Sequence, residues 1–233
     1  MVKVNLARRL VRRARRMWAT RSNAVIFGNI YENRLWGVGS DPEVPFYSGI
    51  GSYDPSVIQY VSLVIDIINR YDVSNVVEIG CGDFTVASQY ADKCKSYLGI
   101  DVVKALVEHN QRTYGTKAVS FLFADASRTK LPACDLCIIR QVLQHLSNRD
   151  IMNILTNITS KYILVTEHLP AAHKITSFNL DKKPGADIRV PQGSGVFIDR
   201  PPFNLNAQVL MEANVTSGIH EAGERLVTWL VSR

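Results

Sequence analysis

The order of apolar and polar residues along the chain predicts strands that alternate with helices. Short apolar runs rich in β-branched residues predict strands at 76–79, 96–100, 119–123, 135–139 and 162–166. Between them, apolar residues recur at helical spacing, which predicts helices at 55–70, 85–93, 102–113 and 148–159. A further helix at 5–20 and an irregular leader at 21–53 are expected before these. Such an alternation is typical of an α/β domain with a parallel sheet.

The C-terminal part of the chain departs from this alternation. Two strand-like runs at 207–211 and 226–231 are separated by turn-prone residues, which predicts an antiparallel hairpin. We therefore expect a Rossmann-like, seven-stranded mixed sheet with helices on both faces and a C-terminal antiparallel hairpin. Before the hairpin lies a long irregular segment at 168–204. A loop of that length in a compact domain is usually functional, and we interpret it as a substrate or lid loop.

The strand at 76–79 ends in a glycine turn that is typical of nucleotide sites. Glu78 is followed by Gly80 and Gly82 and then by a segment that can be helical, a geometry that lets the backbone approach a nucleotide closely. Nineteen residues after Gly82, the next apolar run ends in Asp101, where an acid can bind the hydroxyls of a ribose. Glu78 lies inside its strand, and a buried acid needs a partner, which the ammonium of an amino-acid group would supply.

At these residues the sequence resembles the class I S-adenosylmethionine (SAM)-dependent methyltransferases. The first motif of that family reads roughly acid-x-Gly-x-Gly-x-Gly, and here it runs from Glu78 to Phe84, with Phe84 in place of the third glycine. Segments at 30–52 and 194–204 are also similar to the leader and tail of a bacterial small-molecule or glycan-type subgroup, whose substrate is unassigned.

The resemblance implies SAM as the cofactor and assigns the site by position. Asp101 matches the acid that holds the ribose, and Asp125 matches the residue beside the adenine amino group. The residues expected to bind the cofactor are Tyr47, Ser48, Gly49, Glu78, Gly80, Gly82, Asp101, Val102, Asp125, Ala126 and Arg140.

Two histidines are the candidate catalytic residues. If the acceptor is a hydroxyl, a general base helps by taking its proton, and His145 and His168 both follow predicted strands. His145 is the first choice because it lies in the motif that faces the methyl group in this family. A histidine hydrogen-bonded to the backbone is the alternative interpretation of His145, and a loop histidine beside a proline is that of His168.

The resemblance implies methyl transfer to a small-molecule or glycan acceptor, at a hydroxyl. Two other classes of function stay open, a non-catalytic binding module with the same fold and an NAD-type oxidoreductase. Glu78 and the missing third glycine argue against the oxidoreductase. No metal is expected: Cys134 and Cys137 form a C-x-x-C, but residues three apart on one strand point to opposite faces.

We expect three parts in the chain, a basic amphipathic helix (1–21), a leader or lid (22–53) and a SAM-binding domain (54–233), and charge separates the first from the other two. Residues 1–21 carry eight Lys and Arg and no acid, which leaves nineteen Lys and Arg against 21 Asp and Glu, a net charge of −2, for the rest. Because residues 22–233 carry a slight net negative charge, a nucleic-acid partner is not expected.

The apolar face of the basic helix has three interpretations. It packs on the domain or on a second subunit, it lies on an anionic membrane surface through residues 5–18, or it is an import presequence. No apolar run reaches the ~20 residues that a spanning helix needs. Four cysteines suit a reducing compartment. We expect a cytoplasmic protein, with residues 5–18 as the segment that would contact a membrane.

Overall fold

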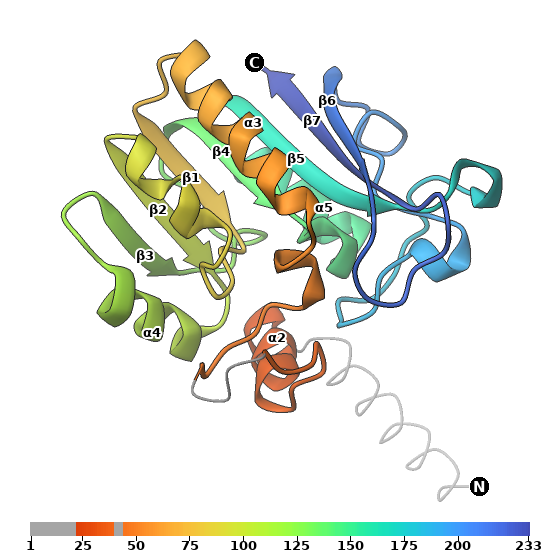
Figure 1. The fold of residues 1–233 in the computed structure, drawn as a ribbon, viewed down its shortest axis with the longest axis horizontal. Coiled ribbons are helices and arrows are strands. Elements are labelled where there is room, and N and C mark those ends of the chain that lie inside the picture. The colour runs from red at the N-terminus through yellow and green to blue at the C-terminus, as the bar shows by residue number, and fades with distance from the viewer. Residues whose placement is uncertain (1–21, 40–43) are drawn as a thin grey trace, which may run out of the picture.

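Seven strands form one mixed sheet in the computed structural model, which describes residues 22–39 and 44–233 (Figure 1). The helix predicted at 5–20, with its membrane interpretation, lies outside the described residues. The strands are β1 (Asn75–Ile79), β2 (Ser96–Asp101), β3 (Val119–Phe123), β4 (Cys134–Arg140), β5 (Ser160–Leu169), β6 (Ala207–Asn214) and β7 (Arg225–Ser232). Their order in the sheet is β3-β2-β1-β4-β5-β7-β6.

The strand directions confirm the predicted fold. Strands β1 to β5 are mutually parallel, whereas β7 is antiparallel to both β5 and β6. The order reverses at β1, whose neighbours are β2 and β4, and ligands of open α/β sheets bind at the carboxyl ends of the strands around such a point. The antiparallel β7, inserted beside β5, differs from the parallel order 3-2-1-4-5-6 of dinucleotide-binding domains.

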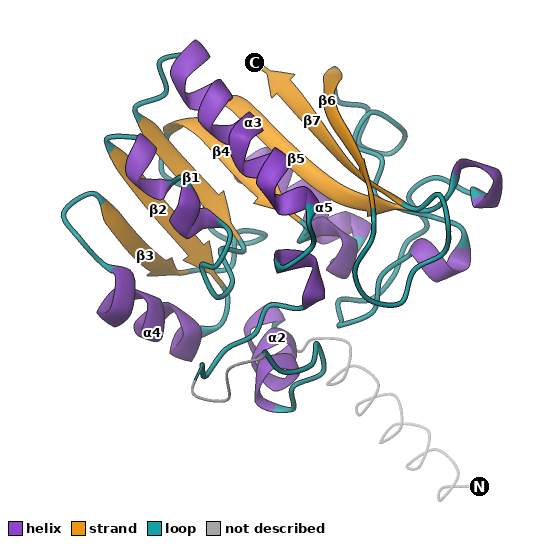
Figure 2. Ribbon diagram, viewed as in Figure 1, coloured by secondary structure: helices purple, strands orange, loops and turns teal. Residues whose placement is uncertain are grey.

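The described residues form four α-helices. They are α2 (Asn23–Glu32), α3 (Ser56–Arg70), α4 (Lys104–Tyr114) and α5 (Asn148–Asn157). In Figure 2, α3 crosses the front of the sheet and α5 lies behind it. Helix α3 buries an apolar stripe of Val57, Tyr60, Val61, Val64, Ile67 and Ile68, which repeats at helical spacing. Single turns of 3₁₀-helix are η1 (Ile50–Ser52), η2 (Ala87–Gln89), η3 (Ala91–Lys93), η4 (Leu143–His145), η5 (Ala172–Lys174) and η6 (Val190–Gln192).

Three local predictions are wrong. The helix predicted at 85–93 is replaced by the two short 3₁₀ turns η2 and η3. In this conformation Tyr90 is buried and its hydroxyl donates a hydrogen bond to Glu78. The leader is not irregular throughout, since α2 forms within it and buries Phe27 and Ile30. The segment 168–204 does not begin as a loop, because pairing with β7 extends β5 through His168 to Leu169.

The C-x-x-C lies on β4. Cys134 and Cys137 are free thiols, and interaction with Cys137 lowers the pKa of the Cys134 thiol. Strand β4 pairs with β1 only from Leu136 onward, so Cys134 precedes the regular pleat on that side. Among the described residues, no group of three or more Cys, His, Asp or Glu is placed to hold a metal ion.

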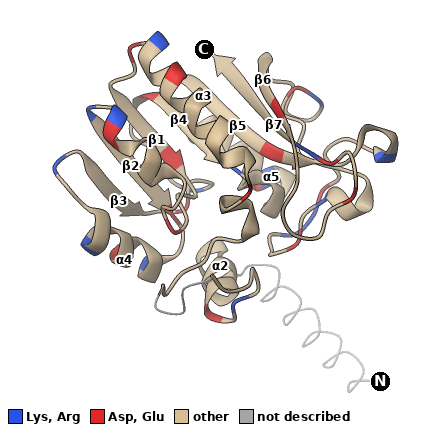
Figure 3. Cartoon of the chain, viewed as in Figure 1, with Lys and Arg blue, Asp and Glu red and all other residues tan. Residues whose placement is uncertain are grey.

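The core lies between the two helical layers. Strands β4 and β5 bury continuous apolar runs, including Ile138, Ile139, Leu164 and Val165, as expected for parallel strands covered on both faces. Acidic and basic residues are interspersed along the described chain in the view of Figure 3. In the part of the chain that the structure describes, none of the helices is long and apolar enough to span a membrane.

Candidate functional site

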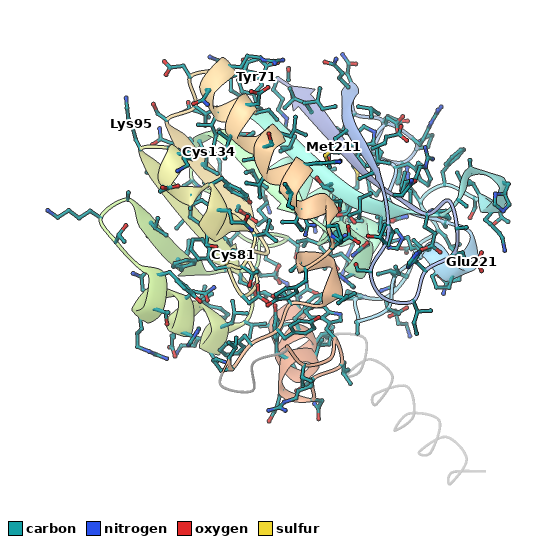
Figure 4. All side chains as sticks on the ribbon, viewed as in Figure 1. Tyr71, Cys81, Lys95, Cys134, Met211 and Glu221 are labelled. Carbon is teal, nitrogen blue, oxygen red and sulfur yellow. The ribbon has the colours of Figure 1, made fainter. Side chains whose placement is uncertain are left out.

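A cavity of about 790 Å³ opens at the carboxyl ends of β1, β2 and β4. Figure 4 labels Cys81, one of its lining residues, where the chain leaves β1 near the leader. The predicted site residues that line the cavity are Ser48, Gly49, Glu78, Gly80, Gly82, Asp101, Val102, Asp125, Ala126, Arg140, His145 and His168. Tyr47 does not line it, because its ring stacks on Tyr53 with the ring centroids 5.4 Å apart. The structure thus brings together all the predicted residues but one, and their roles stay predictions.

The glycine turn requires both of its glycines. Gly80 and Gly82 have φ of 70° and 54°, a left-handed conformation that side chains disfavour. A Cβ at Gly80 would lie 2.4 Å from Val142 Cγ2, and one at Gly82 would lie 2.4 Å from Ser48 Oγ. The bare backbone is therefore needed for the close packing of the turn.

Phe84 takes the place of the third glycine without changing the path of the turn. Its φ is 65°, a conformation that costs a non-glycine residue about 1 kcal/mol or more. Its ring is buried away from the cavity against Tyr97, Tyr114 and Phe121, with centroid separations of 5.5, 5.1 and 5.0 Å. Burial of an aromatic ring offsets the cost of the strained backbone.

Asp101 lies at the end of β2, against the glycine turn. Its two carboxylate oxygens accept hydrogen bonds from the backbone N–H of Gly82 (3.3 Å) and of Val103 (2.9 Å). Burial raises the pKa of Asp101 to about 6, and the backbone donors oppose that rise. This places an acceptor within the cavity, beside the turn.

Asp125 carries a buried acceptor that lacks a hydrogen-bond donor among the described residues. Its Oδ1 accepts from Ser127 Oγ at 2.6 Å, whereas Oδ2 is buried without a hydrogen bond and has only Arg128 Nε at 3.5 Å. A buried polar atom left unpaired costs about 1–3 kcal/mol. Asp125 Oδ2 is therefore suited to an N–H donor from a bound ligand.

The leader is tied to the glycine turn by a reciprocal pair of hydrogen bonds. Ser48 N donates to Asp83 Oδ2 (2.8 Å), and Asp83 N donates to Ser48 Oγ (2.7 Å). Tyr31, on α2, shares a hydrogen bond of 2.9 Å with Ser48 Oγ, and burial and the nearby Asp101 raise its pKa. Tyr31 and Trp36 both line the cavity and were not predicted, although the leader's aromatic residues were a visible signal.

Glu78 has hydrogen-bond partners within the protein itself, besides any that the ammonium of a ligand would supply. The hydroxyls of Tyr90 and Tyr97 donate to its Oε2 at 2.7 and 3.0 Å. Burial raises the pKa of Glu78 to about 7, and these two hydroxyls and Arg140 oppose that rise. Both tyrosines lie outside the motif, so the motif pattern did not indicate them.

Arg140 brings an unmet donor to the site. Its Nη2 donates to the carbonyl of Gly51 (2.9 Å), and its guanidinium lies 5.1 Å from the ring centroid of Tyr60. Its Nε is buried and has no hydrogen-bond partner among the described residues. An anionic or carbonyl group in the cavity would satisfy it.

The two candidate histidines are both buried but have different charged neighbours. The ring of His145 packs on Trp36 (centroids 5.1 Å apart), and burial, followed by Lys182, lowers its pKa to about 4. His168 Nε2 lies 2.8 Å from Glu224 Oε2. Burial lowers the pKa of His168, whereas the Glu224 carboxylate opposes that fall.

Glu167 and Arg189 hold the turn that carries His145 through hydrogen bonds to its backbone. Glu167 is fully buried and accepts from the backbone N–H groups of Leu143 and Gln144, both at 2.9 Å. Arg189 is 1% exposed and donates to the carbonyls of Leu143, Gln144 and Leu146 at 3.3, 3.0 and 2.7 Å. Neither Glu167 nor Arg189 was assigned a role from the sequence.

Comparison with known proteins agrees with this geometry. Residues 76–161 match a family model described as a methyltransferase domain. A sequence comparison with curated proteins finds no match. Among solved structures, the chain is similar to the N-methyltransferase NodS of Bradyrhizobium japonicum WM9 in complex with S-adenosyl-L-homocysteine. The TM-score is 0.60 at 16% identity, covering 91% of this chain and 99% of NodS.

A second similar structure is the magnesium protoporphyrin IX methyltransferase ChlM of Synechocystis PCC 6803 with bound SAM, with a TM-score of 0.56 and 16% identity over 92% of this chain and 99% of ChlM. The chain is also similar to the methyltransferase domain of bacterial CtHen1-CN, with a TM-score of 0.53 and 12% identity. The match covers 75% of this chain and 98% of that domain. The fold is thus that of the SAM-dependent methyltransferases, and residues 76–161 match the model of a methyltransferase domain. Both findings agree with the predicted class of enzyme and with SAM as its cofactor.

Proposed function

We propose that this chain binds SAM across the glycine turn and transfers its methyl group to a hydroxyl of a small-molecule or glycan acceptor. The observation that carries the proposal is one cavity that holds the glycine turn, Asp101, the unpaired Oδ2 of Asp125 and two histidines. The known acceptor type varies among proteins of this fold: NodS is an N-methyltransferase, and ChlM acts on magnesium protoporphyrin IX.

The donors and acceptors of the cavity match the parts of SAM. Asp101 would accept hydrogen bonds from the ribose hydroxyls, and Asp125 Oδ2 would accept one from the adenine amino group. Val102 and Ala126, which follow the two acids, would flank the adenosine. The glycine turn, with Ser48 and Gly49 from the leader, would hold the amino-acid end.

Arg140 and Glu78 would also bind the amino-acid end of SAM. Arg140 Nε would donate to the methionine carboxylate, and Glu78 would face its ammonium. Tyr47 stays a prediction as a cofactor contact, and its position outside the cavity lining gives it a weaker basis than Ser48 and Gly49.

The reaction asks the protein mainly for alignment. SAM supplies a reactive methyl group on a sulfonium. The chain must hold the acceptor oxygen in line with that group and exclude water, and positioning of this kind contributes about 7–11 kcal/mol in favourable intramolecular models. Removal of the hydroxyl proton by His145 or His168 supplies general-base assistance.

Calorimetric titration of the full chain with SAM and with S-adenosylhomocysteine tests the proposal. We expect saturable heat with both ligands. Asp101→Ala should weaken binding by about 10- to 100-fold, because it removes hydrogen bonds from a charged acceptor worth about 1.5–3 kcal/mol. Asp66→Ala is the matched control, since Asp66 is exposed on α3 and pairs with the exposed Arg70. Absence of heat from folded protein with either ligand would contradict the proposal.

A further inference from the structure

The cavity extends beyond the proposed cofactor contacts to an apolar rim. Leu35, Ile50 and Ile219 line it, yet they are 61%, 48% and 107% exposed. They come from the leader, from η1 and from the connection between β6 and β7, and we call these three residues the apolar collar. A Cβ on Gly218 would lie 2.9 Å from Ile50 Cγ2, so the β6–β7 connection packs on η1 (Figure 1).

Exposed aliphatic side chains at the mouth of a cavity are suited to an apolar ligand. Large aliphatic groups exposed together on a soluble domain mark binding sites, whereas single exposed ones need no explanation. Ile188 and Leu226 also line the cavity, and we call these two residues and the collar together the apolar wall. The ligand that this wall favours has an apolar body rather than a fully hydroxylated one.

The wall leads to the pair of His168 and Glu224. His168 lies directly opposite Leu226 in the β5–β7 ladder, so the two side chains share a face of the sheet, and both line the cavity. Glu224 is 2.8 Å from His168 Nε2, and the two side chains are only 10% and 12% exposed. Since Glu224 does not line the cavity, it supports the imidazole from behind.

This arrangement suits a base better than that of His145. A base that takes a proton becomes a cation, and a nearby carboxylate stabilises the cation whereas a nearby ammonium destabilises it. Glu224 and Asp54 favour protonated His168, with His220 opposing them. His145 faces Lys182, which opposes its protonation, and Asp187, which favours it.

We propose that the acceptor is a hydroxyl carried on an apolar body, which enters past the collar, and that His168, oriented by Glu224, takes the hydroxyl proton. The inference rests on the proposed methyl transfer. The bond between the acceptor oxygen and the methyl carbon forms as the sulfur–methyl bond of SAM breaks. The proton passes to the His168 nitrogen that does not bond Glu224, leaving S-adenosylhomocysteine, a methyl ether and an imidazolium beside Glu224.

Two glucosides with the same sugar test the acceptor class. Octyl β-D-glucopyranoside, below its micelle concentration, and methyl β-D-glucopyranoside are titrated by calorimetry into the full chain saturated with S-adenosylhomocysteine. We expect the octyl probe to bind at least about tenfold more tightly, and Ile219→Asp and Ile50→Asp to remove that preference. Ile58→Asp, at a residue 76% exposed on α3 and outside the cavity lining, should keep it.

Equal affinity for the two glucosides, absence of octyl glucoside binding, or the same loss in Ile58→Asp would overturn the acceptor class. If S-adenosylhomocysteine itself binds, such a result leaves the proposed function standing. Flotation with phosphatidylcholine vesicles then separates two sources of the acceptor. Vesicle binding that Ile219→Asp abolishes supports a bilayer lipid, and binding of the octyl probe alone supports a dissolved molecule.

NMR titration and turnover measurements test the roles of His168 and Glu224. In the S-adenosylhomocysteine complex, NMR titration of the imidazole signals, with His168 assigned by its loss in His168→Gln, should show a lower His168 pKa in Glu224→Gln. With SAM and octyl glucoside, His168→Gln should lose more turnover than His145→Gln. An unchanged His168 titration in Glu224→Gln, no turnover of the bound octyl probe, or an equal or larger loss in His145→Gln would overturn the assignment.

Discussion

Glu78 is buried beside groups that favour its charge, yet burial dominates. Tyr90 and Tyr97 donate to one carboxylate oxygen, and Arg140 lies near, but the pKa of Glu78 is still raised to about 7. Without a ligand, its neutral and charged forms are therefore both populated near neutral pH. A bound ammonium group would shift it toward the carboxylate.

This raised pKa predicts a loss of stability with rising pH. A carboxyl whose pKa is higher in the folded chain stabilises the fold fully below its unfolded value of 4.5, and that contribution is lost as pH rises through about 7. From pH 4.5 to 8, Glu78 should lower the free energy of unfolding by up to about 3 kcal/mol. Urea unfolding should show a flatter pH dependence in Glu78→Gln than in the exposed control Glu108→Gln. Identical slopes in the two variants would show that Glu78 is not the group responsible.

At the scale of elements, η4 is held by two buried side chains from separate segments. Glu167 on β5 accepts from its backbone N–H groups, and Arg189, beside η6, donates to its carbonyls. Burial raises the pKa of Glu167 to about 8, although the two N–H groups and Arg189 oppose that rise. The two residues connect the post-β4 turn with the 170–204 segment.

Arg189→Leu should destabilise the fold more than a surface change does. It leaves the carbonyls of η4 without donors and Glu167 without its cation, which predicts a loss of about 3–5 kcal/mol in the free energy of unfolding. Arg149→Leu, at an exposed position on α5, should change it by about 0.5 kcal/mol or less. Denaturant unfolding measures both. A loss below about 1 kcal/mol in Arg189→Leu would mean that the turn does not depend on this residue.

At the scale of the whole molecule, the cavity joins segments from both ends of the described chain. Asp54, just before α3, accepts from Thr216 N (3.1 Å) and Ser217 N (2.9 Å) in the β6–β7 connection. Burial alone would raise the pKa of Asp54, but hydrogen bonds with residues 56, 216 and 217 hold it well below its usual range. The leader, the sheet and the hairpin are therefore expected to unfold as one unit.

A ligand of the cavity should stabilise that unit as a whole. S-adenosylhomocysteine at 100 times its Kd contributes about 2.7 kcal/mol, which should raise Tm by about 5–10 °C for a chain of this size. The shift should be equal by far-UV circular dichroism and by tryptophan fluorescence, because Trp36 lies in the leader and Trp229 in β7. The Trp36→Phe variant gives the fluorescence melting curve without the contribution of the leader tryptophan. A leader that melts at a lower temperature than the sheet would contradict a single cooperative unit.

How far the sequence could predict the site depended on the range of each interaction. The sequence predicted the strand at 76–79, the glycine turn after it and the acids Asp101 and Asp125. Apolar runs, turns and strand ends are encoded within a few neighbouring residues. The helix predicted at 85–93 failed for the opposite reason, since packing of Tyr90 against Glu78 overrides local helix propensity.

The sequence by itself determined the alternation of strands and helices and the resemblance that implied the cofactor. Only the tertiary structure decided which side chains meet: Glu78 with Tyr97, nineteen residues away, His168 with Glu224, 56 residues away, and Arg189 with η4. The periodicity of a helix or a strand repeats within a few residues and can be read directly. A contact between distant residues depends on how all the elements pack, and no local pattern records it.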